Sequence, residues 1–123
     1  MSLLIPVSIG ELVDKITILE IKLEKILNNE ALVNIKKELL ALKKVQITSV
    51  ESELFENLKC VNLEIWNVED ELREYERKQT FNNDFITKAR SVYVLNDKRA
   101  ANKKHINNKY NSEIKEEKSY YIY

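Results

Sequence analysis

The sequence predicts an all-α protein, an antiparallel bundle of about four helices that ends in a long helical hairpin. The chain of 123 residues contains one Gly and one Pro. It therefore lacks the turn residues of sandwiches and barrels and the glycine-rich phosphate loops of doubly wound folds. Apolar residues instead recur in steps of three and four through most of the chain, as on one face of a helix. Because 44% of the residues are hydrophobic, a core can form, and the length predicts a single helical domain over residues 1–123.

Two shorter helices are expected in the first part of the chain. Ser8 and Glu11 have the spacing of a capping box, so the first helix should start at Ser8. Its apolar stripe consists of Ile9, Leu12, Ile16, Leu19, Leu23 and Ile26. Asp14 and Thr17 share a face away from this stripe and are expected to be solvated. A second helix is expected over residues 30–44, with the same apolar period.

A long helical hairpin is expected in the second half. Residues 51–79 form the third helix, whose apolar positions alternate steps of four and three, and a fourth helix follows the turn at 80–83. Residues 51–79 carry nine acidic and four basic side chains, net −5, and residues 80–111 carry seven basic and two acidic, net +5. Packing must nevertheless hold the hairpin, because an exposed ion pair contributes only about 0–1 kcal/mol.

The contact stripe of the fourth helix is apolar at both ends and polar in the middle. The third helix has a polar stripe one step beside its own apolar positions. If the hairpin turns near Phe81, Trp66 lies level with Asn96 and Asn62 with Arg99, so the two polar stripes should face each other. The candidate site residues are Asn62, Trp66, Glu69, Arg73, Arg90, Tyr93, Asn96, Asp97, Arg99 and Lys103.

Three interpretations of this polar layer remain open. It can be a structural hydrogen-bonded layer in which Glu69 and Asp97 neutralise Arg90 and Arg99. The polar end of the bundle can instead be hydrated or covered by another subunit. It can also be a pocket that holds a small anionic ligand, a carboxylate or a phosphate, between two aromatic walls. The residues of that pocket would be Arg90, Arg99, Lys103, Trp66 and Tyr93.

The composition argues against several other classes of protein. One Cys and one His cannot form an intrachain disulfide or a Cys/His zinc site, and Cys60 is expected to be a small buried hydrophobe. No metal or cofactor is expected. A magnesium site needs acidic pairs that face each other from two helices, and the expected fourth helix offers only Asp84 and Asp97. With 20 basic and 20 acidic side chains, nucleic acid is not an expected partner. No apolar run reaches the roughly 18 residues of a membrane span, and we expect a cytoplasmic protein.

Both ends of the chain carry short expected features. Ser112 could cap one further helical turn in the tail. The segments 3–5 and 120–123 are strand-like and could pair, although two short strands alone are marginal.

Four separated motifs resemble a small bacterial family of unknown function. They are Pro6–Leu12 with Asp14–Leu19, then Asn62, Trp66 and Glu69-Asp70, then Ala89–Tyr93 with Asn96–Arg99, and finally Glu116–Tyr120. The resemblance covers nearly the whole chain. It implies a bacterial, all-helical, single-domain protein and no activity, since none is established for the family. Where that family has Gly before the Ser of the tail, this chain has Asn111, which can also adopt a left-handed turn.

Residues Leu12–Leu19 also resemble the first helix of the helical chorismate mutases. The resemblance covers about one helix. Those enzymes hold a dicarboxylate with Arg and Lys inside a dimeric bundle, and the polar layer has the right residue types for that chemistry. Lys25, however, stands about where such an enzyme would carry an arginine.

The sequence as a whole favours a non-catalytic helical binding or assembly module. The alternative is a small helical enzyme or anion-binding protein that holds its ligand as a chorismate mutase does. An enzyme should have a closed pocket where Arg90, Arg99 and Lys103 converge with unpaired donors, whereas a module should have these donors satisfied by Glu69 and Asp97. We also expect a homodimer, because so narrow a bundle leaves an apolar edge uncovered.

Overall fold

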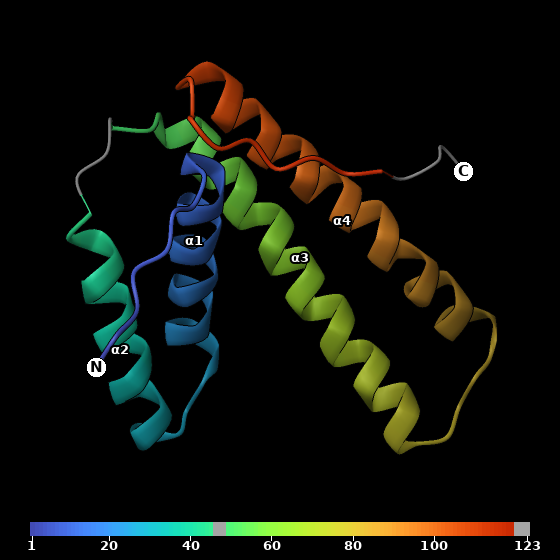
Figure 1. The fold of residues 1–123 in the computed structure, drawn as a ribbon. Helices are drawn as coiled ribbons and strands as arrows, with labels where there is room; N and C mark the ends of the chain where they lie inside the picture. Colours follow the sequence, from blue (N-terminus) through green and yellow to red (C-terminus); the bar gives the residue numbers. More distant parts are fainter. Residues whose placement is uncertain (46–48, 120–123) are drawn as a thin grey trace.

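The computed structural model describes residues 1–45 and 49–119, and it confirms an all-helical bundle. The helices are α1 (Ile9–Lys25), α2 (Asn29–Lys43), α3 (Ser52–Arg77) and α4 (Asn83–Lys109). The two longest, α3 and α4, form the expected C-terminal hairpin (Figure 1). Within the described ranges there is no strand, and none of the helices is both long enough and apolar enough to cross a membrane.

Three of the four helices begin with a side-chain cap. Ser8, Asn28 and Asn82 each accept a hydrogen bond from the backbone N–H three residues further on, which satisfies a donor that the helix leaves unpaired. For α3, the N-cap is Glu51, and its side chain makes no capping hydrogen bond. Thr48 and Glu51 have the sequence spacing of a capping box, but Thr48 lies outside the described residues.

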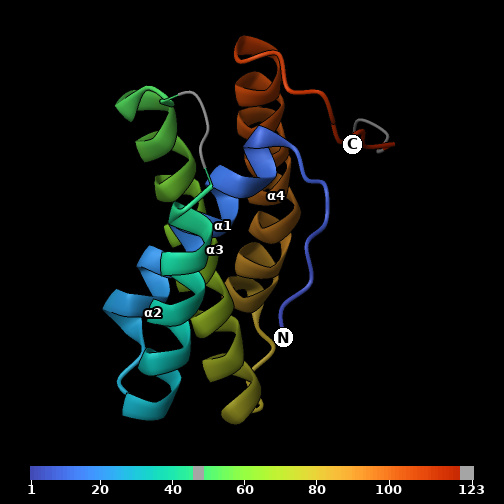
Figure 2. The ribbon, with the colours of Figure 1, turned by 60° about the vertical axis from the view of Figure 1, so that its left-hand side comes forward.

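The central element of the fold is α1, which lies between α2 and the hairpin (Figures 1 and 2). Among the described residues, α2 packs only against α1, whereas α1 also contacts both α3 and α4. Two buried clusters result. One joins α1 to α2 through Leu19, Ile35 and Leu39, and the other joins α1 to the hairpin through Val13, Leu58 and Ile106. Each such side chain contributes about 1.5–3 kcal/mol by burial.

This central position overturns the expectation that Asp14 and Thr17 are solvated. Their exposed fractions are 1% and 0%. The apolar stripe of α1 faces α2 at Leu19, but the hairpin covers a second side of the same helix, and that is the side from which Asp14 and Thr17 project. A polar residue off the main stripe is therefore buried here.

The expected burial of Cys60 is also wrong, because this residue is exposed. Val61, the next residue, is the one that packs into the core, with an exposed fraction of 9%. Successive residues point about 100° apart around a helix, so Cys60 lies beyond the edge of the contact.

The tail does not begin another helical turn at Ser112. Asn111 adopts the expected left-handed conformation, with φ of 50°, and this turns the chain back along α4 (Figure 1). The buried Ser112 hydroxyl then accepts a hydrogen bond from the Ile9 backbone N–H at 3.0 Å and donates one to the Ile114 carbonyl at 2.7 Å. The expected cap therefore serves the first turn of α1.

At the other end, residues 3–5 have no regular secondary structure and are exposed. Their expected strand partner, residues 120–123, lies outside the described residues.

Candidate functional site

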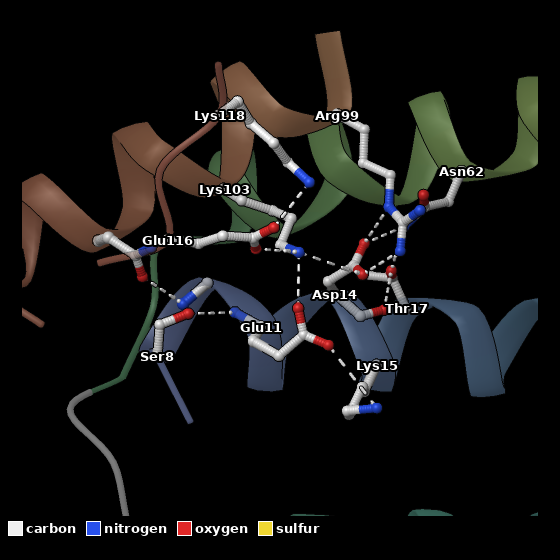
Figure 3. A network of polar contacts seen from close by, with 12 residues as sticks. Ser8, Glu11, Asp14, Lys15, Thr17, Asn62, Arg99, Lys103, Glu116 and Lys118 are labelled. Carbon is white, nitrogen blue, oxygen red and sulfur yellow. Dashed lines mark hydrogen bonds and ion pairs between the residues drawn. The ribbon is translucent and has the colours of Figure 1, made fainter. Parts of the chain in front are cut away.

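The carboxylate of Asp14 ties three helices together (Figure 3). The guanidinium of Arg99, on α4, donates two hydrogen bonds to this carboxylate, from Nε to Oδ1 at 3.0 Å and from Nη2 to Oδ2 at 2.5 Å. Asn62 on α3 donates its amide to Asp14 Oδ1 at 2.8 Å and to Thr17 Oγ1 at 2.8 Å. The Thr17 hydroxyl in turn donates to the Asp14 backbone carbonyl at 2.7 Å. Such two-pronged arginine–carboxylate pairs fix orientation as well as charge.

A second ion-pair group lies beside the first and includes the tail (Figure 3). The Lys103 ammonium donates to Glu11 Oε2 at 2.6 Å and to Glu116 Oε2 at 3.1 Å, and it lies 3.9 Å from Asp14 Oδ2. Lys118 pairs with the other oxygen of Glu116 at 2.8 Å. One lysine of α4 thus bridges the start of α1 to the segment that follows α4. We call these residues, together with Asn62, Thr17 and Arg99, the ionic cluster.

The ionic cluster stabilises the charged form of its members. The hydrogen bond with Asp14 raises the pKa of Arg99. Burial alone would lower the pKa of Lys103, but its hydrogen bonds with Glu11 and Glu116 outweigh burial and raise it. In the described part of the chain, no buried side-chain nitrogen or oxygen lacks a hydrogen-bond partner. Buried charges persist only when they are paired in this way.

Acid should release the tail from the cluster. Hydrogen bonds from Lys118 and Lys103 lower the pKa of Glu116 to about 2. A carboxyl group whose pKa falls on folding stabilises the fold above its unfolded value of about 4.3 and loses that contribution as pH falls toward the folded value. We therefore expect the tail contact to weaken between about pH 4 and pH 2. NMR titration of the Glu116 carboxyl carbon measures this directly, and the midpoint should rise in Lys118→Ala. An unshifted midpoint in the wild type would rule out this contact.

Contacts between the backbone of α1 and helix α4 hold the cluster in position. The Gly10 backbone N–H, in the first turn of α1, donates to Asn107 Oδ1 of α4 at 2.7 Å. The two helices are so close here that a Cβ atom on Gly10 would lie 2.6 Å from the Lys103 carbonyl oxygen. The first-turn N–H groups of a helix need external acceptors, and in α1 side chains at the end of α4 and in the tail supply two of them.

The structure brings together only some of the candidate residues expected from the sequence. Asn62, Arg99 and Lys103 meet, as expected, but they meet at Asp14 of α1. The expectation that Glu69 or Asp97 neutralises Arg99 is wrong, since Asp14 does so. Glu69 instead pairs with Arg73 on its own helix at 3.3 Å.

Asn96 does not join the layer, because its side chain is exposed. The buried residue at this level of α4 is Leu95, with an exposed fraction of 6%. One step along the helix turns a side chain by about 100°, which moves Asn96 out of the contact. Trp66 is half-buried.

Two further candidates, Arg90 and Tyr93, line an open groove on the other face of the hairpin. This groove encloses about 520 Å³ and is lined by Glu64 and Val68 of α3 and by Thr87, Lys88, Arg90, Ser91, Tyr93, Val94, Leu95 and Lys98 of α4. Glu64 follows Asn62 by two residues and so points about 200° away from it around α3. Since Asn62 faces α1, the groove faces away from α1. The residues expected to form one anion pocket thus lie at two separate places, Arg90 and Tyr93 in the groove and Arg99 and Lys103 in the ionic cluster.

The groove already contains some internal pairing. A hydrogen bond from the Arg90 guanidinium to the Tyr93 hydroxyl raises the pKa of Arg90. Lys88 pairs with Glu71 of α3 at 2.9 Å. Over residues 1–45 and 49–119, no group of three or more His, Cys, Asp or Glu side chains could hold a metal ion.

Comparison with known proteins identifies a family. A family model described as a family of unknown function, DUF6165, matches residues 3–123. The chain belongs to this family. Neither the curated proteins nor the solved structures give a match. Membership of DUF6165 confirms the resemblance drawn from the four sequence motifs, and it brings no activity with it.

Sequence reasoning missed five members of the cluster in this DUF6165 chain. They are Glu11, which was expected only to complete a helix cap, and Asp14, Thr17, Glu116 and Lys118. One signal could have found two of them. Ile18 and Ile21 lie off the main apolar stripe of α1, which indicates that a second side of this helix is covered. A polar pair on a helix covered on two sides needs buried partners.

Proposed function

We propose that this chain is a non-catalytic helical binding and assembly module that associates with a second copy of itself. The observation that carries the proposal is that the ionic cluster is neutral within itself. Arg99 is paired with Asp14, and Lys103 with Glu11 and Glu116. Donors that are already paired orient the helices and the tail, and they are not available to a substrate. This leaves the outer surface as the place of function.

An exposed apolar surface supports self-association. Large hydrophobic side chains with exposed fractions between 38% and 88% occur at Leu27, Val33, Leu40, Val45, Phe81, Ile86 and Val94. They lie in α2 or beside its two ends and along the hairpin, and α1 covers these elements on one side only. Exposed apolar surface of this kind favours association with a partner. The bacterial origin and the cytoplasmic location remain predictions from the sequence.

The alternative function, an enzyme or anion-binding protein, has weaker support. It requires Arg90, Arg99 and Lys103 to converge with unpaired donors, but Arg90 lines the groove while Arg99 and Lys103 belong to the ionic cluster. One observation still favours anion binding as a second candidate. Lys88, Arg90 and Lys98 line the same groove, and a phosphate or carboxylate could lie among them.

Light scattering after size-exclusion chromatography tests the proposal. At about 10 μM chain we expect a mass twice that of one chain, because specific homodimers commonly associate at this concentration or below. A mass of one chain would contradict self-association. Thermal stabilisation of such a monomer by inorganic phosphate or a dicarboxylate, lost in Arg90→Ala, would favour the second candidate instead.

A further inference from the structure

The groove on the outer face of the hairpin has edges of opposite charge. Its charged lining residues are Glu64 on α3 and Lys88, Arg90 and Lys98 on α4. The helices as a whole have the same bias, since α3 carries eight acidic and three basic side chains and α4 carries two acidic and seven basic. The floor of the groove is apolar, formed by Val68, Val94 and Leu95, and Val94 is 38% exposed. An acidic edge, an apolar floor and a basic edge lie side by side, so the face is complementary to a rotated copy of itself.

Glu64 and Lys98 face each other across this groove at a similar height. Three contacts fix the register of the hairpin: Glu71 with Lys88 at 2.9 Å, the rings of Tyr75 and Phe85 at 5.9 Å, and the shared binding of Asp14 by Asn62 and Arg99. Counted back from the turn, Glu64 and Lys98 therefore lie within about one helical turn of each other. In the described part of the chain neither side chain has an ion-pair partner.

Charge decides how two such faces can stack. A two-fold axis in the plane of the interface runs either across the helices or along them. An axis across the helices would place α3 on the partner's α3, acid against acid. An axis along the helices places α3 on the partner's α4, acid against base, and keeps residues of equal height together. Since like charges that face each other repel, the second arrangement is favoured.

We propose that a second copy of this chain docks on the groove face, hairpin against hairpin, about a two-fold axis parallel to α3 and α4. In this dimer Glu64 of each copy faces Lys98 of the other. The proposal rests on the self-association proposed above and specifies its surface. The available area is sufficient: α3 has 26 residues, and a face about 39 Å long and about 20 Å wide covers about 800 Å², the contribution of each partner to a standard interface.

Complementary charge reversals test this arrangement. In Glu64→Lys, position 64 and Lys98 are both basic, and in Lys98→Glu position 98 and Glu64 are both acidic. Each variant alone should therefore repel its own copies, and we expect a rise of at least about tenfold in the dissociation constant of the dimer. An equimolar mixture of the two variants should form a heterodimer of wild-type strength, because each lysine then meets a glutamate. Pairing within one chain cannot produce this rescue. The measurements are sedimentation velocity on each variant and on the mixture.

Asp70→Lys is the matched control, since Asp70 is exposed on the same helix, six residues from Glu64, and points about 240° around α3 from it. It should leave the dimer intact, and thermal melts should show all three variants folded. If the wild type is a dimer and both single variants remain dimers, this face is not the interface, although self-association stands. If the variants dissociate but the mixture does not reassociate, Glu64 and Lys98 do not face each other. A monomeric wild type would overturn both proposals.

Discussion

Arg99→Ala is expected to lower the free energy of unfolding by about 3 kcal/mol. The substitution removes both nitrogens that bind the Asp14 carboxylate, and that carboxylate is 1% exposed. Asn62 then supplies its one remaining close partner, while the Lys103 ammonium lies 3.9 Å away. A buried charge without a full set of partners is destabilising because water cannot replace them. Urea unfolding at pH 7, followed by circular dichroism, measures the change.

Arg73→Ala is the matched control for this prediction. Arg73 also pairs with an acidic residue, Glu69, but both side chains are largely exposed, so the stability should stay within experimental error. The double variant Asp14→Leu with Arg99→Met removes both charges and should recover most of the loss, as apolar replacement of a buried ion pair often does. A small effect of Arg99→Ala, similar to that of Arg73→Ala, would mean that Asp14 is hydrated and the cluster is not buried.

The hairpin could be predicted from the sequence because its information is local. The apolar positions of residues 51–79 repeat along one helix, and the turn expected at 80–83 precedes the next helix, which begins at Asn83. The same register argument placed Asn62 level with Arg99, and both residues bind Asp14. Periodicity shows which side of a helix is covered, and a turn shows which residues lie level, so these features need no knowledge of the rest of the fold.

The ionic cluster could not be completed from the sequence because its centre depends on how α1 packs against the hairpin. The period of α1 fixes the direction of Asp14 relative to Leu19, but not which helix lies in that direction. Glu116 is a further case, since it enters the cluster only because the left-handed Asn111 turns the tail back along α4. Long-range choices of this kind decide whether a carboxylate is solvated or buried.

Gly10→Ala is expected to destabilise the fold by about 2 kcal/mol, against the preference of the helix itself. Alanine is favoured over glycine within a helix by about 1 kcal/mol, so a substitution that affected only α1 would stabilise the protein. Here the new methyl group would lie 2.6 Å from the Lys103 carbonyl oxygen. That oxygen belongs to the backbone of α4, so the two helices must move apart and the Gly10 N–H bond to Asn107 must lengthen. Urea unfolding gives the sign of the effect.

Asn107→Ala separates this steric effect from the hydrogen bond that it accompanies. Alone, it removes the acceptor of the Gly10 N–H and should cost about 1–2 kcal/mol. Combined with Gly10→Ala it cannot restore stability, because the closest atom to the new methyl group is a backbone oxygen that no side-chain deletion removes. A Gly10→Ala protein that is more stable than the wild type would show that α1 and α4 are not in contact at this point, and the ionic cluster, which depends on that contact, could not form as described.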